Sequence, residues 1–110
     1  MTRIQSTLAI ALLSFIPAIA FSAGNAAAGQ NKSAVCHACH GETGKSLQPI
    51  YPNLGGQHQD YLSMTLHSFR DGSRQNVIMS GFAANLSDAD IEDISAWYAS
   101  QQGLTEITDK

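Results

Sequence analysis

Apolar side chains recur at helical spacing in three stretches of the chain, which are 26–38, 59–71 and 88–102. Residues three or four positions apart share one face of a helix, so each stretch is able to bury that face. No stretch alternates apolar and polar residues as a β-strand does. The pattern therefore predicts an all-α domain. The clearest apolar face belongs to the last stretch and consists of Ile91, Ile94, Trp97 and Tyr98.

Residues typical of helix ends support these boundaries. Ser87, with Asp90 three positions later, resembles a capping box at the start of the last helix. Gly72 follows the middle helix, where glycine commonly terminates helices. The stretch 41–56 is rich in glycine and proline, which predicts a loop. Residues 77–82 are apolar without a helical period, and we expect a second loop there.

Gly29 lies inside the first predicted helix, where glycine costs about 1 kcal/mol relative to alanine. Close approach of another helix would offset this cost. A frayed helix end, where the cost vanishes, is the alternative.

Composition limits the function classes. The 110 residues carry a net charge of -3, and 44% of them are hydrophobic. This length allows one small domain. The few lysines and arginines exclude a strongly basic nucleic-acid-binding protein.

The N-terminus has the features of a secretory signal peptide. Arg3 precedes a mostly apolar run over 7–21, and small residues follow at the spacing that signal peptidase requires. This run is short for a spanning helix, which needs about 20 apolar residues. We expect residues 1–22 to be cleaved, leaving a domain of residues 23–110 in the periplasm. An uncleaved N-terminal anchor is the alternative.

One motif dominates the rest of the chain. Residues 36–40 have the sequence Cys-His-Ala-Cys-His, the attachment signature of c-type haem. Cys36 and Cys39 lie on one side of a helical turn, so their thiols are placed to bond the two vinyl groups of one haem. His40 then lies beneath the iron as its proximal ligand. The sequence predicts one covalent haem c per chain.

Three competing roles for the two cysteines fit the sequence less well. A thioredoxin-like pair requires a βαβ pattern, which is absent from this sequence. A zinc site commonly uses two pairs of ligands, and His58 and His67 form no second pair. A structural disulfide between Cys36 and Cys39 would close a very small loop.

The second ligand of such an iron is often methionine. Met64 falls off the apolar stripe of the middle helix, which indicates a surface or gap-filling side chain. Met79 lies in the predicted loop 77–82, from which a side chain can reach a haem face, and we favour it. His67 is the alternative ligand, although it lies mid-helix. We expect His37 and His58 to be exposed.

Two charged features each allow two interpretations. The acidic run at the start of the last helix either favours the helix dipole or forms a docking patch for a basic partner. Arg70 and Arg74 flank the end of the middle helix and are either exposed or near the haem propionates. The acidic run consists of Asp88, Asp90, Glu92 and Asp93.

The order of these features resembles class I cytochrome c, especially cytochrome c553 and the single domains of two-haem cytochrome c4. The stretches that carry the resemblance are 23–30, 36–41, 51–57, 61–62, 79–82, 86–88 and 96–101. The resemblance implies a class I cytochrome c fold, with three to four helices around one covalently attached haem.

The resemblance also implies roles for individual residues. Met79 occupies the family's M-x-G position and would be the distal ligand. The carbonyl of Pro52 would accept a hydrogen bond from His40 Nδ1, and Leu54 would pack on the haem. Gly29 would meet Trp97 or Tyr98 where the first and last helices cross.

The implied function is electron transfer without enzymatic activity. Expected partners are other redox proteins, such as membrane cytochrome complexes, oxidases or reductases. We expect no nucleic acid or small-molecule substrate, and a monomer or weak dimer. The alternative is a haem sensor or small catalytic haem protein with a labile sixth ligand.

Overall fold

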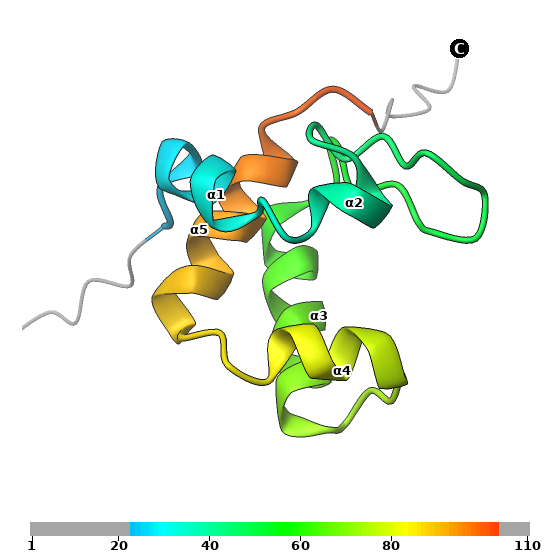
Figure 1. The fold of residues 1–110 in the computed structure, drawn as a ribbon. Helices are drawn as coiled ribbons and strands as arrows, with labels where there is room; N and C mark the ends of the chain where they lie inside the picture. Colours follow the sequence, from blue (N-terminus) through cyan, green and yellow to red (C-terminus); the bar gives the residue numbers. More distant parts are fainter. Residues whose placement is uncertain (1–22, 104–110) are drawn as a thin grey trace, which may run out of the picture.

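The structure is a computed structural model that describes residues 23–103. No strand occurs in this part of the chain, and the predicted all-α fold is confirmed (Figure 1). No helix within these residues has the length and apolar character needed to cross a membrane. The predicted signal peptide, 1–22, and the end of the predicted domain, 104–110, lie outside the described residues. The helices are α1 (Ala26–Lys32), α2 (His37–His40), α3 (Gln59–Asp71), α4 (Val77–Ala83) and α5 (Asp88–Ala99).

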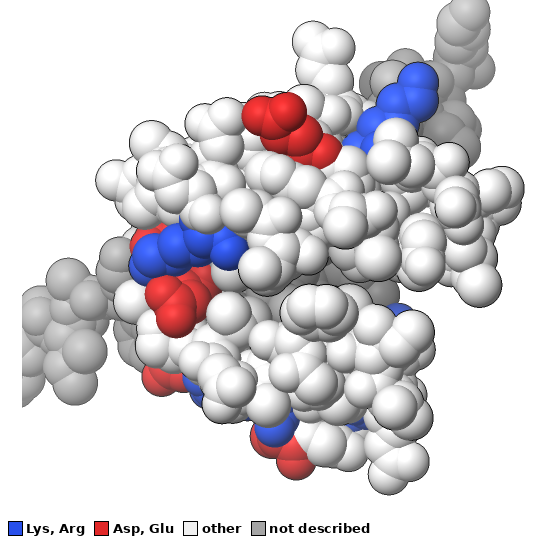
Figure 2. Space-filling view, viewed as in Figure 1, with Lys and Arg blue, Asp and Glu red and all other residues white. Residues whose placement is uncertain are grey.

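Helix α5 is the element on which the others assemble. Helices α1 and α3 both pack against α5, and α4 packs against α3. The core consists of Leu62 on α3 with Ile94 and Tyr98 on α5. Cys36 and Leu54 pack against this core, so the cysteine motif and the loop after it are attached directly to α5 and α3. On the face shown in Figure 2, a hollow opens between α2 with its loop and α4.

The middle helix and the start of the last helix agree with the prediction. Helix α3 has the predicted bounds. Ser87 Oγ accepts from the amide of Asp90 at 3.1 Å, and the Asp90 carboxylate accepts from the amide of Ser87 at 3.0 Å, which completes a capping box. Helix α5 ends at Ala99, earlier than the predicted end at 102.

The predicted first helix over 26–38 is wrong in its length. Helix α1 ends at Lys32, and a turn over 33–36 separates it from the single turn of α2. The fully buried Ser33 explains the break, because its hydroxyl donates to the Gln30 carbonyl at 3.1 Å. Serine hydroxyls that bond to nearby backbone compete with continued helix.

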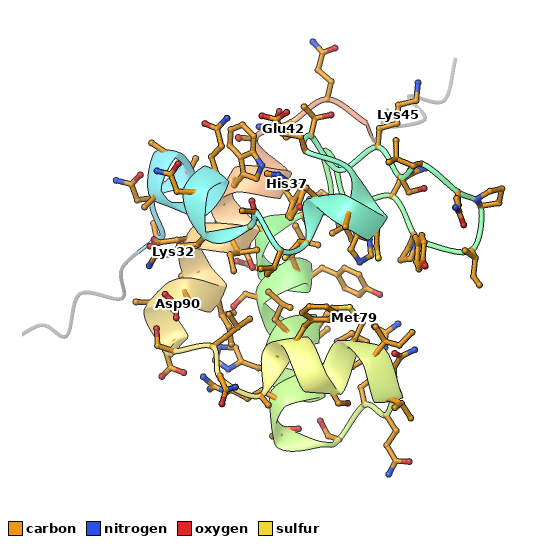
Figure 3. The ribbon with its side chains drawn as sticks, viewed as in Figure 1. Lys32, His37, Glu42, Lys45, Met79 and Asp90 are labelled. Carbon is orange, nitrogen blue, oxygen red and sulfur yellow. The ribbon has the colours of Figure 1, made fainter. Side chains whose placement is uncertain are left out.

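The predicted loop over 77–82 is also wrong, because these residues form α4. Asn76 caps this helix, since its side-chain oxygen accepts from the amides of Ile78 at 3.1 Å and Met79 at 2.9 Å. The fully buried Ala83 anchors the helix at its other end. Helix α4 places Met79 on its side toward α2 (Figure 3).

Gly29 marks the crossing of α1 and α5, as the resemblance implies. A Cβ atom on Gly29 would overlap the carbonyl oxygen of Asp93 and lie 2.9 Å from Trp97 Cβ. Only glycine allows this approach without movement of a helix. The close packing of α1 on α5 therefore offsets the helix-propensity cost of glycine inside α1.

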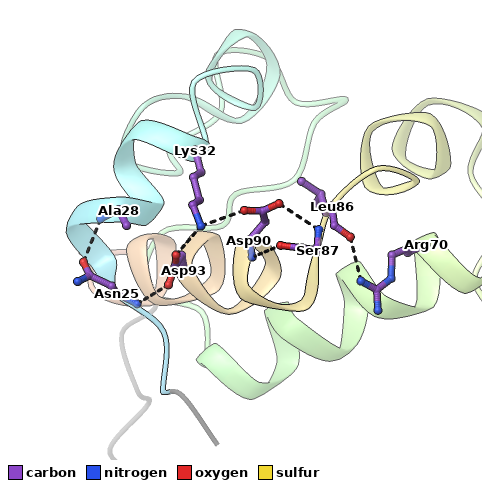
Figure 4. A network of polar contacts seen from close by, with 8 residues as sticks. All are labelled: Asn25, Ala28, Lys32, Arg70, Leu86, Ser87, Asp90 and Asp93. Carbon is purple, nitrogen blue, oxygen red and sulfur yellow. Dashed lines mark hydrogen bonds and ion pairs between the residues drawn. The ribbon is translucent and has the colours of Figure 1, made fainter.

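An ion-pair network joins the same two helices at their surface (Figure 4). Lys32 Nζ lies 2.9 Å from Asp90 Oδ1 and 2.7 Å from Asp93 Oδ2. The amide of Asn25 donates to Asp93 Oδ1 at 2.7 Å. The bond from Lys32, followed by the bonds from Ser87, lowers the pKa of Asp90 to about 2. Lys32 and Asn25 lower the pKa of Asp93 as well.

Replacing Gly29 by valine should lower the free energy of unfolding by about 1–3 kcal/mol, because overpacking forces α1 away from α5. Ala27→Val is the matched control, since Ala27 lies in the same helix and is exposed. It should lose less than about 1 kcal/mol, which is the helix-propensity difference alone. Urea denaturation of the haem-loaded protein measures both. Equal losses would place the crossing elsewhere.

The ion-pair network should make stability depend on acid pH. The folded-state pKa of Asp90 is about 2, against an ordinary value of 3.8. The contribution of ionised Asp90 to the free energy of unfolding is therefore present above about pH 3.8 and is lost as the pH falls through about 2. Lys32→Gln should make the decline between these values shallower in urea denaturation, whereas Lys45→Gln, a change at another exposed lysine, should not. An unchanged slope in Lys32→Gln would contradict the assigned role of the network.

Candidate haem site

The two cysteines lie on one helical turn, as the spacing predicts. The amides of Cys39 and His40 donate to the Cys36 carbonyl at 3.3 and 2.9 Å, which winds residues 36–40 into a turn. Both cysteines are free thiols and half-buried, so the disulfide alternative is not what the structure contains. Burial, followed by the neighbouring Cys39, raises the pKa of the Cys36 thiol. Two reduced sulfurs are thus available on one side of α2.

The His40 ring is held in one orientation. It is 7% exposed, and its Nδ1 lies 2.8 Å from the carbonyl oxygen of Pro52. The nitrogen donates in this bond, because a carbonyl oxygen only accepts. The bond therefore directs Nε2 away from the Pro52 loop as the ligating atom. The Tyr51 ring meets the imidazole edge to face, with centroids 6.4 Å apart.

Helix α5 holds the residues that directly follow His40. Trp97 Nε1 donates to the Glu42 carbonyl at 2.9 Å, and the Tyr98 hydroxyl donates to the Gly41 carbonyl at 3.4 Å. Burial raises the pKa of the Tyr98 hydroxyl, which keeps it protonated as a donor. The sequence places these rings on the apolar face of α5 but does not reveal their hydrogen bonds. Buried Trp and Tyr side chains usually have a hydrogen-bond partner, so the sequence indicates that partners exist but not which groups they are.

The other three histidines have different surroundings. His58 is exposed, as expected. The expected exposure of His37 is wrong, because it is half-buried with Nε2 3.1 Å from the hydroxyl of the buried Ser33. His67, the alternative ligand, has its Nδ1 2.9 Å from the guanidinium of Arg70.

The two methionines differ in their surroundings. Met79 is half-buried and lies on the side of α4 toward α2 (Figure 3). Met64 is 58% exposed on α3 and lines a separate pocket with Ser63, His67 and Glu92. The structure therefore brings Met79, and not Met64, to the wall that faces the cysteine motif.

These residues fit a haem group. Two thiols and an oriented imidazole lie on the turn that contains α2, and a thioether lies on α4. Leu54 is half-buried against the core beside Cys36. Within residues 23–103, no group of three or more His, Cys, Asp or Glu side chains is arranged to bind a metal ion by itself, so the described fold does not support the zinc alternative.

Comparison with known proteins agrees with this geometry. A family model described as cytochrome c oxidase, cbb3-type, subunit III matches residues 24–97. The chain belongs to this family of c-type cytochrome domains. Members of this family carry covalently attached haem c, which is therefore the cofactor of this cytochrome.

Individual relatives support the same assignment. Cytochrome c4 of Pseudomonas aeruginosa is 47% identical over 91 residues, covering 83% of this chain and 45% of the relative. Cytochrome c-554(548) of Halomonas halodenitrificans is 49% identical over 83 residues, covering 73% of this chain and 100% of the relative. The chain thus spans less than half of the longer relative and the whole of the shorter one.

A solved structure confirms the fold. The crystal structure of reduced recombinant cytochrome c4 from Pseudomonas stutzeri superposes with a TM-score of 0.70 at 44% identity. The match covers 74% of this chain and 48% of that one. The helices of this cytochrome therefore follow the class I cytochrome c fold.

The exported protein should contain one haem that stays with the polypeptide. Intact mass spectrometry should show the chain plus one haem, and acid-acetone treatment should leave the haem in place, because thioether bonds resist extraction. The double variant Cys36→Ala, Cys39→Ala should lose its haem to acid-acetone. Extraction of haem from the parent protein would contradict attachment through these two residues.

Proposed function

We propose that this cytochrome carries single electrons between redox proteins of the periplasm, with His40 and Met79 as the two protein ligands of its iron. When bound, haem supplies the one-electron couple between ferrous and ferric iron. The observation that supports the proposal is an oriented imidazole on α2 and a half-buried thioether on α4, the two helices that border one hollow. Two protein ligands leave no open position for a substrate, so the proposed role is not enzymatic.

His40 is proposed as the proximal ligand because its other nitrogen is already engaged. Donation from Nδ1 to the Pro52 carbonyl fixes the ring plane and increases the basicity of Nε2. Trp97 and Tyr98 hold the two residues that follow. Such a site changes little in geometry between oxidation states, which suits rapid electron exchange.

Met79 is proposed as the distal ligand because of its place on α4. A thioether sulfur opposite histidine raises the reduction potential relative to two nitrogen ligands. The half-buried position of Met79 supports this role, whereas Met64 is exposed in a different part of the surface. Cys36 and Cys39 are proposed as the thioether residues, and Leu54 as an apolar contact of the haem.

The periplasmic location follows from the motif together with the N-terminal segment. Haem is attached to such motifs after export, and residues 1–22 have the character of a signal peptide. The proposed partners are membrane cytochrome complexes, oxidases or reductases, and the proposed state is a monomer or weak dimer. Intact mass of the exported protein reports whether residues 1–22 are removed.

A haem sensor with a labile sixth ligand is the second candidate. The short length of α4, only seven residues, favours it, because a single short helix carries the proposed distal ligand. Carbon monoxide separates the two functions, since it binds ferrous iron only where the sixth position opens. Rapid binding to the parent protein would favour the sensor.

Met79→Ala should open the iron to carbon monoxide and abolish the weak long-wavelength absorption band that marks methionine bound to ferric iron. Met64→Leu is the control and should leave both properties as in the parent, because Met64 is exposed on α3. Absorption spectra of the two oxidation states measure both effects. The reverse pattern would assign Met64 as the ligand instead.

A further inference from the structure

Helix α4 is held differently at its two ends. On its N-terminal side, residues 71–78 are all exposed, and Asn76 bonds only to amides of α4 itself. On its C-terminal side, Ala83 is fully buried and Leu86 packs against the core. The position of α4, and of Met79 on it, therefore depends on the packing of α4 against α3 and on the connection between α4 and α5.

The side chain of Arg70 reaches this connection from α3 (Figure 4). Its NH1 donates to the carbonyl of Leu86 at 2.9 Å, and its NH2 donates to Asp88 Oδ1 at 2.6 Å and to His67 Nδ1 at 2.9 Å. The amide of Leu86 in turn donates to the Ala83 carbonyl at 3.1 Å. One guanidinium thus joins α3, the end of α4 and the start of α5.

No other side chain makes this connection within the part of the chain that the structure describes. Among residues 23–103, only Arg70 donates or accepts a side-chain hydrogen bond into the segment 75–86 from outside it. The planar guanidinium suits this task because it presents several donors in fixed directions. Both terminal nitrogens of Arg70 are engaged by the protein.

The charge of Arg70 is balanced locally. The bond from Arg70 lowers the pKa of Asp88, which keeps that carboxylate ionised. The side chain of Arg70 is 28% exposed and that of Asp88 is 79% exposed, so water screens the bond to Asp88 more than the partly buried bond to the Leu86 carbonyl. Charge-assisted bonds of this kind are about twice as strong as neutral ones.

We propose that Arg70 is a positioning residue, which holds α4 where Met79 reaches the iron. This inference rests on the proposed ligation by Met79. Without the bond to Leu86, α4 would move about its exposed N-terminal connection and the sixth position would open more often. Loss of a charge-assisted bond of this strength should increase the open population about tenfold or more.

The test compares haem-loaded variants of the full chain. Arg70→Gln removes both the positive charge and the planar guanidinium with its paired donors. Arg70→Lys keeps the charge but removes the paired donors. Arg74→Gln is the control, because it removes a positive charge just after α3 from a side chain that stacks 4.8 Å over the Phe69 ring. Met79→Ala gives the response of an open iron.

Three measurements report on each variant: the rate of carbon monoxide binding to the ferrous protein, the methionine–iron band of the ferric protein, and the urea midpoint. Arg70→Gln should bind carbon monoxide about tenfold faster or more and show a weakened methionine–iron band. Loss of one charge-assisted hydrogen bond shifts the equilibrium between the closed and open positions of α4 by about this factor. Arg70→Lys should lie between Arg70→Gln and the parent, and Arg74→Gln should match the parent in rate and band.

A purely structural role would lower the midpoint of Arg70→Gln and leave the rate and band as in Arg74→Gln, which would overturn the proposal. If Arg70→Gln does not accumulate, Arg70→Lys provides the test. Carbon monoxide binding to Arg70→Lys at the rate of Arg74→Gln would also overturn the positioning role of Arg70. If Met79→Ala itself behaves as the parent, the ligand assignment fails and the inference falls with it. That outcome is distinct from failure of Arg70 alone.

Discussion

The contact between Gly29 of α1 and the backbone of α5 determines where the haem motif lies. Because Gly29 has no side chain, α1 approaches the Asp93 carbonyl closely, and the chain leaves α1 close to the aromatic end of α5. Trp97 and Tyr98 are then within reach of the two carbonyls that follow His40. A packing constraint between two helices thereby becomes a constraint on the orientation of the proposed proximal ligand.

The two walls of the hollow are held to different degrees. The wall with His40 is fixed by the Pro52 carbonyl, by the edge of Tyr51 and by two hydrogen bonds from α5. The wall with Met79 is a seven-residue helix that packs on α3. Its connection to α5 is held by the burial of Ala83, by the packing of Leu86 and by the bond from Arg70 to the Leu86 carbonyl. Variation in the iron environment is therefore expected to arise at α4 rather than at α2.

How much the sequence reveals depends on whether a signal is local or tertiary. Helix α3 and the start of α5 are predictable because apolar spacing and capping residues are local. The break after α1 escapes prediction, because it depends on the burial of Ser33, and α4 escapes it because seven residues show too little periodicity to distinguish helix from loop. The roles of Trp97 and Arg70 are also hidden in the sequence, because their partners lie far away along the chain.

The acidic run of α5 shows how one set of residues serves several local needs. Asp90 completes the capping box and also pairs with Lys32, and Asp88 pairs with Arg70. Asp93 joins Lys32 to the amide of Asn25. Three of the four carboxylates of the acidic run thus have a cation or a backbone amide as their partner within the same fold. The surface that borders the hollow is mostly uncharged on the face seen in Figure 2.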